Sequence, residues 1–414
     1  MRVFKSSLII SFSLFFLTAN AQNSDQFSGK IVDETNQSMP YVSLKIGSSI
    51  SSMTNPDGDF SLRIPVGTTG QITVSCIGYQ TLYIPIQQLS NPVTIKMKSA
   101  VSQLQEVKIS ALNGEAIIRK AVHNITQNYP VTAFESTGFY REIAKIDENY
   151  LSFAEASLQI LNPGYQHNKE KDRIIINKER NLKRVGDRAV DNPFHAAVKG
   201  VPYVVLANDL LKNPGSIFGE RYISKYNYTI SGYTAVDGEE AYIIKFDQKT
   251  GINEALYQGS VIVIKKSFAI ASIEISYSDK GRRFAKSDIA FLQRPLLMLL
   301  GYHFQKTNEM LSLRYTMNGD KWYPYFYKIA TTHQVEAKRQ KIAGELLVSA
   351  ELFIRPVPAV KSDFSKKNIM PENYSFQQGV ERYTDQYWKE FDYIKPEHTL
   401  KDLVDKQAAG KDIN

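Results

Sequence analysis

Three oxygen-bearing side chains, Asn55, Asp57 and Asp59, stand at alternate positions in the stretch TNPDGDFSLRIP and could form a metal loop. Their i, i+2, i+4 spacing is that of a calcium-binding EF-hand loop. Such a loop also requires glycine at its sixth position and glutamate at its twelfth, where this sequence has Phe60 and Val66. The stretch is therefore interpreted as a turn at the Asp-Gly pair followed by a strand.

A second possible metal site is the HxxE pair of His167 and Glu170, with His303 at a separation that would suit a third zinc ligand. Zinc carboxypeptidases use such a pair, but they need alternating strands and helices around a parallel sheet. This chain has a polar loop there and a series of hairpins after it. We find no His-Glu-x-x-His, Gly-x-Ser-x-Gly, Ser-x-x-Lys or Walker-type motif. The sequence therefore predicts no catalytic residue, no metal and no cofactor.

The first 21 residues have the features of a cleaved signal peptide. Arg2 and Lys5 precede an apolar run that is too short to span a bilayer, and Ala19-Asn20-Ala21 follows it. The formal charge of +8 falls by two with the leader, to +6. We expect an exported protein, periplasmic or associated with the outer membrane. The mild positive charge favours anionic surfaces, and export argues against nucleic acid.

A single cysteine, Cys76, excludes internal disulfides and cysteine-based zinc fingers. With Val74 and Ile77 beside it, Cys76 is interpreted as a small buried residue. A chain with 43% hydrophobic residues can instead be stabilised by a large core.

Short alternating runs broken by turn residues fill the region 27–97, a pattern typical of an all-β sandwich. The candidate strands are KIVDE, VSLKI, DFSLRI, QITVSC, TLYIPI and VTIKM. The order of Gly29, Asp33, Pro40-Tyr41-Val42, Asp57-Gly58 and Ile77-Gly78-Tyr79 resembles the carboxypeptidase regulatory-like domain. The resemblance implies a seven-stranded, Ig-like β-sandwich over 22–98, best known as a non-catalytic N-terminal module of outer-membrane and surface proteins of Bacteroidota.

A polar linker is expected at 99–112, followed by an amphipathic helix over 114–128. Asn113 is a candidate N-cap, and Pro130 ends the helix. The stretch Pro295–Phe304, PLLMLLGYHF, suits a second short helix or a buried loop. We place a curved antiparallel domain at 113–380 and a C-terminal cap and tail at 381–414.

Nearly ten long strands joined by tight hairpins follow the first helix. The fold class expected is thus mainly β: a sandwich joined to a large curved antiparallel sheet or half-barrel with one or two helices. The stretch GSVIVIKKSFAIASIEI is similar to the hairpin of lipoprotein-carrier and sorting-factor half-barrels. That resemblance implies an apolar ligand on the concave face, bound by the inward residues of these strands, namely Val261, Val263, Ile273 and Ile275.

The densest basic run is KERNLKRVGDR, which contains Lys178, Arg180, Lys183, Arg184 and Arg188. Its plain interpretation is a solvated edge strand whose charges block edge pairing. The alternative is a patch that contacts anionic head groups or acidic glycan. The 24 tyrosines could likewise stack on sugars, although packing of β faces is their default role.

Two function classes are consistent with these patterns. In the first, a non-catalytic cell-envelope protein binds a lipid or acyl chain in the curved domain, with the sandwich as a docking module. In the second, both domains form an assembly module that contacts outer-membrane proteins or glycan. An enzyme whose site is built from distant loops ranks last. An apolar cavity lined by alternate strand residues would favour the first class, and a filled core the second.

Overall fold

The computed structural model describes residues 24–47, 50–100, 113–147, 149–166, 170–183, 201–285, 301–337, 342–357, 362–376, 394–395 and 402. The predicted leader and most of the predicted linker and tail lie outside these residues. The domain boundaries that depend on those segments stay predictions.

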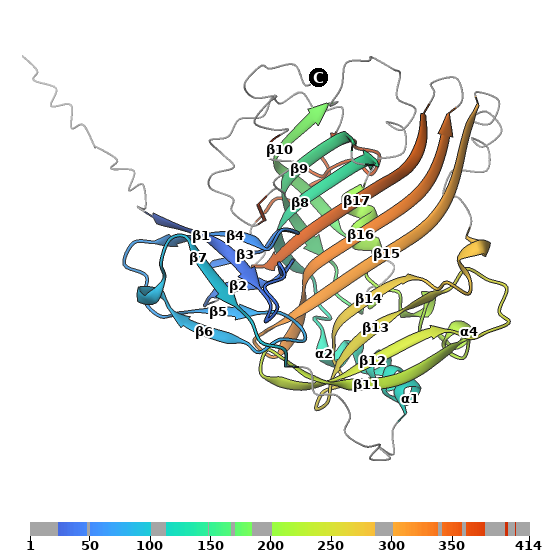
Figure 1. Cartoon of the computed structure of the whole chain (residues 1–414), viewed down its shortest axis with the longest axis horizontal. Helices are drawn as coiled ribbons and strands as arrows, with labels where there is room; N and C mark the ends of the chain where they lie inside the picture. The colour runs from blue at the N-terminus through green and yellow to red at the C-terminus, as the bar shows by residue number, and fades with distance from the viewer. Residues whose placement is uncertain are drawn as a thin grey trace, which may run out of the picture.

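The N-terminal domain is a sandwich of two sheets (Figure 1). One has three strands, in the order β4 (Asp59–Pro65), β1 (Ser24–Val32) and β7 (Val93–Lys96). The other has four, in the order β3 (Ile50–Met53), β2 (Ser43–Ile46), β5 (Gln71–Ser75) and β6 (Leu82–Pro85), and a short 3-10 helix η1 (Ile86–Gln88) follows β6. The seven strands expected are confirmed.

Alternation in β4 explains how this sandwich closes. Phe60, Leu62 and Ile64 are all at most 3% exposed and belong to the core of the domain. The turn before them has Gly58 at φ +80°, and the Asn55 side chain accepts a hydrogen bond from the Asp59 backbone N–H at 2.8 Å. Asn55 thus serves the turn, as the turn interpretation of this stretch requires.

The second domain is built on one ten-stranded antiparallel sheet (Figure 1). Its strands, in spatial order, are β10 (Arg173–Lys183), β9 (Asn149–Asn162), β8 (Phe134–Ile146), β17 (Ile342–Pro356), β16 (Lys321–Ala337), β15 (Tyr302–Asn318), β14 (Ile270–Tyr277), β13 (Tyr257–Ile264), β12 (Glu239–Gln248) and β11 (Tyr226–Val236). The part of the chain that the structure describes contains no pairing of β10 with β11, so the sheet has two edges.

Hairpins join most neighbouring strands, but β8 has one partner that is distant in sequence. It pairs with β9 directly after it, and with β17 in a register that sets Ile146 opposite Leu346. Turn residues with positive φ, such as Asp147, Asp237 and Gly238, stand at the hairpin tips as the sequence predicted.

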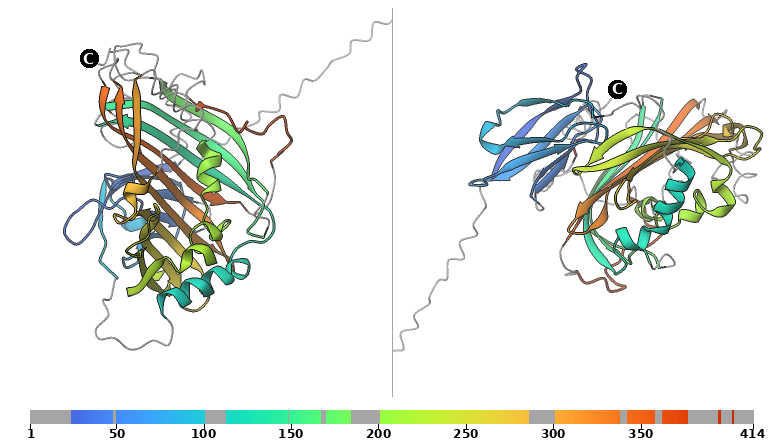
Figure 2. Two further views of the ribbon diagram at one scale, coloured as in Figure 1. Left: turned by 90° about the vertical axis from the view of Figure 1, so that its right-hand side faces the viewer. Right: turned by 90° about the horizontal axis from the view of Figure 1, so that it is seen from below.

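Helices cover the concave face of this sheet, and Figure 2 shows α1, in cyan, inside its curve. They are α1 (Gly114–His123), α2 (Ile125–Asn128), α3 (Val201–Ala207) and α4 (Glu220–Ile223), with 3-10 turns η3 (Pro214–Ser216) and η4 (Arg282–Phe284). The stretch 114–128 is helical as predicted, but it is divided at Asn124 into α1 and α2. The predicted cap is present: the Asn113 side chain accepts from the Ala116 N–H at 2.8 Å. Of the stretch Pro295–Phe304, residues 302–304 start β15 and 295–300 lie outside the described residues. None of the described helices is long and apolar enough to cross a membrane.

The N-terminal domain packs on the outer face of the large sheet (Figure 2). Tyr41 lies at this contact. The Tyr41 ring stacks on Phe326 with 4.8 Å between centroids, and its hydroxyl donates to Glu351 at 2.6 Å. Lys328 donates to the same hydroxyl, and Arg314 donates to the Tyr41 carbonyl at 2.9 Å. Aromatic packing and charge-assisted hydrogen bonds therefore hold the two domains together.

An apolar cluster extends this junction, and it includes a residue close to the chain end. Ile394 forms a β-bridge with Met53 of β3 and belongs to the same apolar cluster as Phe139 of β8. Its carbonyl accepts from the Arg141 guanidinium at 2.8 Å.

Candidate functional site

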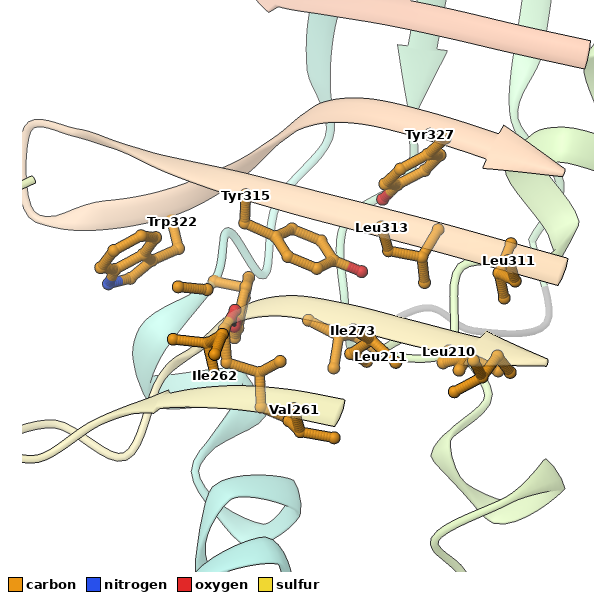
Figure 3. Packing of buried hydrophobic residues seen from close by; sticks show 14 of the residues in the cluster. Leu210, Leu211, Val261, Ile262, Ile273, Leu311, Leu313, Tyr315, Trp322 and Tyr327 are labelled. Atoms are coloured by element: carbon orange, nitrogen blue, oxygen red, sulfur yellow. Dashed lines mark hydrogen bonds between the residues drawn. The ribbon is translucent and has the colours of Figure 1, made fainter. Parts of the chain in front are cut away.

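The four residues expected to bind a ligand lie on the concave face, under the helices. Val261, Val263 and Ile273 have no exposed surface and Ile275 is 4% exposed. Val261 pairs directly with Ile273 across β13 and β14. Figure 3 shows Leu211 from the segment after α3 beside Ile273. Side chains of the chain itself thus occupy the space in front of these residues, and a ligand would have to replace them.

Two helical segments form this covering layer, residues 113–128 and 201–223, and we refer to them together as the helical cover. Their apolar residues join the main core of the domain, which includes Ile117, Ile118 and Ala121 from α1 and Val205 and Leu206 from α3. Burial of such side chains contributes about 1.5 to 3 kcal/mol each for the larger ones. The cover is therefore held mainly by non-directional apolar contact.

One polar group fixes the cover to the sheet: the buried carboxylate of Asp209. It accepts hydrogen bonds from the hydroxyls of Tyr165 at 2.9 Å, Tyr315 at 2.7 Å and Tyr327. Burial, and then the nearby Asp209 charge, raises the pKa of all three tyrosines well above the ordinary value. The hydroxyls consequently stay protonated and available as donors. Asp209 itself has no exposed surface.

Three ion pairs involve the cover at other points. Lys212 donates to Asp172 at 2.7 Å, with both side chains 7% exposed. Burial raises the pKa of Asp172 while Lys212 opposes that rise. Arg119 of α1 bridges Glu115 at 2.8 Å and Glu220 of α4 at 2.5 Å on the surface. The Lys212–Asp172 pair anchors the cover inside, and the Arg119–Glu220 pair joins its two segments.

The structure describes two of the three possible zinc ligands found in the sequence. His167 lies outside the described residues, and Glu170 and His303 are exposed. Within the described ranges, no group of three His, Cys, Asp or Glu side chains could hold a metal ion. Burial raises the pKa of the Cys76 thiol, with Arg314 acting in the opposite direction, which disfavours the reactive thiolate.

The basic run divides between the interior and the surface. Arg180 on β10 is 6% exposed, because its side chain turns inward to pair with Glu155 at 2.5 Å. Lys178 is half-buried, the side chain of Lys183 is not described, and Arg184 and Arg188 lie outside the described residues. Arg180 therefore cannot contact an anionic surface without breaking a buried ion pair.

Sequence reasoning missed Asp209 and its tyrosines. The three hydrogen bonds span 44, 106 and 118 residues of sequence. A lone Asp in ANDLLKN resembles a surface residue, and tyrosines are ordinary in strands. The only available signal was the hydrophobic context, since Leu206, Leu210 and Leu211 flank this aspartate.

Another buried carboxyl, Glu142 on β8, predicts a measurable pH dependence of stability. Its Oε2 accepts from the Tyr140 hydroxyl at 2.6 Å, while its buried Oε1 has no hydrogen-bond partner among the described residues. Burial raises its pKa from 4.5 to about 7, although the Tyr140 bond opposes this. Because the folded state then holds a proton that the unfolded state has lost, the free energy of unfolding falls as pH rises from about 4.5 to about 7.

The total loss over that window is about 3 kcal/mol. Glu142→Gln is expected to remove most of this change of the free energy of unfolding with pH, as measured by urea unfolding at several pH values. Glu345→Gln, at an exposed position, is the control and should keep the slope of the original protein. A Glu142→Gln protein with an unchanged slope would contradict this assignment.

Comparison with known families identifies the first domain. Residues 27–109 match the family model of the CarboxypepD_reg-like domain. The N-terminal sandwich is a carboxypeptidase regulatory-like domain. The match to this regulatory-like domain ends at residue 109, before α1 begins at Gly114. It therefore does not include the large sheet or the helical cover. A comparison with curated proteins found no match.

Among solved structures, the second domain is similar to a LolA superfamily protein from Nitrosomonas europaea, at 15% identity and a TM-score of 0.22, covering 60% of this chain and 96% of that one. A putative outer membrane lipoprotein-sorting protein domain from Vibrio parahaemolyticus is similar at 15% identity and a TM-score of 0.24, covering 62% of this chain and 98% of that one. A DUF1329 family protein from Desulfovibrio piger is similar at 13% identity and a TM-score of 0.24, covering 62% of this chain and 99% of that one. The first two names match the resemblance to lipoprotein carriers noted in the sequence. TM-scores this low say nothing about what this chain binds.

Proposed function

We propose that this protein is a non-catalytic cell-envelope protein that binds a lipid or acyl chain between the concave face of the large sheet and its helical cover. The regulatory-like domain would serve as its docking module. The observation that carries this proposal is the composition of the layer between sheet and cover. Val261, Val263 and Ile273 present a continuous apolar surface, and short helices rather than a second sheet close it.

Such a cover can move at moderate energetic cost. An acyl chain that replaces Leu210 and Leu211 against Ile273 and Leu313 restores the apolar contacts that the displaced side chains lose. No strand pairing has to break, because the cover forms no part of the ten-stranded sheet. The hydrogen bonds of Asp209 would determine how readily residues 201–223 separate from the concave face of the sheet.

The competing function is an envelope assembly or glycan and protein interaction module. The filled concave face favours it, since protein side chains occupy the place of a ligand. In that case the apolar layer is only a core, and the surfaces of both domains are the functional parts.

Native mass spectrometry of the exported chain, purified from the periplasm, distinguishes the two functions. We expect extra mass that organic extraction removes. Ile273→Phe adds volume between the concave face of the sheet and the helical cover. It should lower the fraction of protein that carries lipid severalfold. Glu274→Phe places the same side chain on the opposite face of β14, where Glu274 is 53% exposed, and should leave the occupied fraction unchanged.

A clean mass for the unmodified protein would contradict lipid binding and leave the assembly function. Equal loss in both variants would place any bound lipid elsewhere. Thermal unfolding of each variant shows whether it is folded.

A further inference from the structure

A hollow lies on the convex face of the same strands, against the regulatory-like domain. It has a volume of about 780 Å³ and is open to solvent. Strands β11 to β16 form its floor, and Tyr41 stands at the side of the regulatory-like domain. We call it the junction groove.

Cross-strand register aligns the floor of the junction groove into one row. Thr229 pairs with Lys245, Lys245 with Ser260, Ser260 with Glu274, Glu274 with Ser312, and Ser312 with Lys328. Short hydroxyl side chains thus alternate with charged ones across six neighbouring strands. The row gives the groove a floor of hydroxyls with charged groups at intervals.

Most charges in the groove are neutralised. Lys280 pairs with Asp247 at 2.5 Å and Arg314 pairs with Glu274 at 3.2 Å. Lys328 pairs with Glu351 at 2.9 Å. Lys245 differs from these cations.

The Lys245 side chain is exposed, and within the described part of the chain it has neither a hydrogen-bond partner nor a carboxylate. The groove therefore carries one uncompensated positive charge, and it lies between the hydroxyls of Thr229 and Ser260.

The polar row of this lining suits a sugar. Met310, which is 39% exposed, adds an apolar contact beside it. Hydroxyls and the amides of Asn227 and Gln258 can both donate to and accept from sugar hydroxyls. A lone cation among them can pair with a sugar carboxylate.

We propose that the junction groove binds an acidic oligosaccharide, with Lys245 pairing with a uronate carboxylate. The row spans six strands, which are about 4.8 Å apart, so the ligand is an oligomer rather than a single sugar. This site is separate from the proposed lipid site. On β13 and β14, Ser260 and Glu274 face the groove, while their neighbours Val261 and Ile273 face the helical cover.

Isothermal titration calorimetry of the full exported chain tests this site, with a short oligogalacturonate and a malto-oligosaccharide of equal length as probes. We expect the acidic probe to bind more tightly than the neutral one, and high salt to weaken it. Lys245→Ala should weaken binding about fivefold or more. Lys249→Ala removes an exposed lysine outside the groove and should have no effect.

Absence of binding, equal affinity for the neutral probe, or an equal loss with Lys249→Ala would overturn the proposal. Because Lys245 lies on the surface, its variant should fold normally, and thermal unfolding checks this. The groove and the proposed lipid site lie on opposite faces of the sheet, so failure of the lipid proposal leaves this test intact.

Discussion

Glu155→Ala is expected to lower the free energy of unfolding by about 3 to 5 kcal/mol. Glu155 has no exposed surface and stands between two guanidinium groups. Its Oε1 accepts from Arg141 at 2.8 Å and its Oε2 from Arg180 at 2.5 Å. Without the carboxylate, two buried positive charges face each other, and the expected loss is a large fraction of the stability of an ordinary domain.

Urea unfolding measures this loss, and two comparison variants locate its cause. Glu372→Ala breaks the exposed pair with Lys171, whose side chains are 65% and 73% exposed, and should cost less than about 1 kcal/mol. Replacing Arg141, Glu155 and Arg180 together by methionine or leucine should recover most of the loss, because no unpaired charge then remains. If the triple variant is as unstable as Glu155→Ala, shape rather than charge explains the effect.

Asp209→Ala is expected to destabilise the protein by about 3 kcal/mol and to loosen residues 201–223 more than the sheet. The change leaves the hydroxyls of Tyr165, Tyr315 and Tyr327 without their shared acceptor in a buried place. Hydrogen exchange should therefore increase first in α3 and the segment after it.

Asn208→Ala, at the partly exposed neighbouring position, is the matched control and should change exchange little. Tyr327→Phe removes one donor and leaves Asp209 with two tyrosines, so its effect should be smaller than that of Asp209→Ala. Uniform loss of protection across the sheet would show that Asp209 supports the whole domain and not the cover in particular.

Sequence pattern predicted the elements of the fold because local rules govern them. Residues 114–128 have the helical spacing and the Asn113 cap, and both were found. β3, Ile50–Met53, was not predicted, since ISSM has too few alternating apolar residues to indicate a strand. Its pairing with β2 and the burial of Met53 at the domain junction stabilise this strand.

The sites were harder to predict because they depend on contacts between distant strands. Alternation placed Val261 and Ile273 inward correctly, but it gave no sign that a helical cover would lie against them. The inward turn of Arg180 follows from its opposition to Glu155 across β10 and β9, a register that the basic run does not reveal. The junction groove likewise depends on six strands in register and on a second domain.

The pairing of β8 with β17 has a consequence for the order of events during folding. Ile146 and Leu346 are 200 residues apart in sequence, so β8 gains its second neighbour only when two distant segments of the chain meet. Until then β8 has an unpaired edge, which is a template for wrong pairing with other chains. Closure of this long-range pairing is therefore a folding step before which the edge of β8 is open to aggregation.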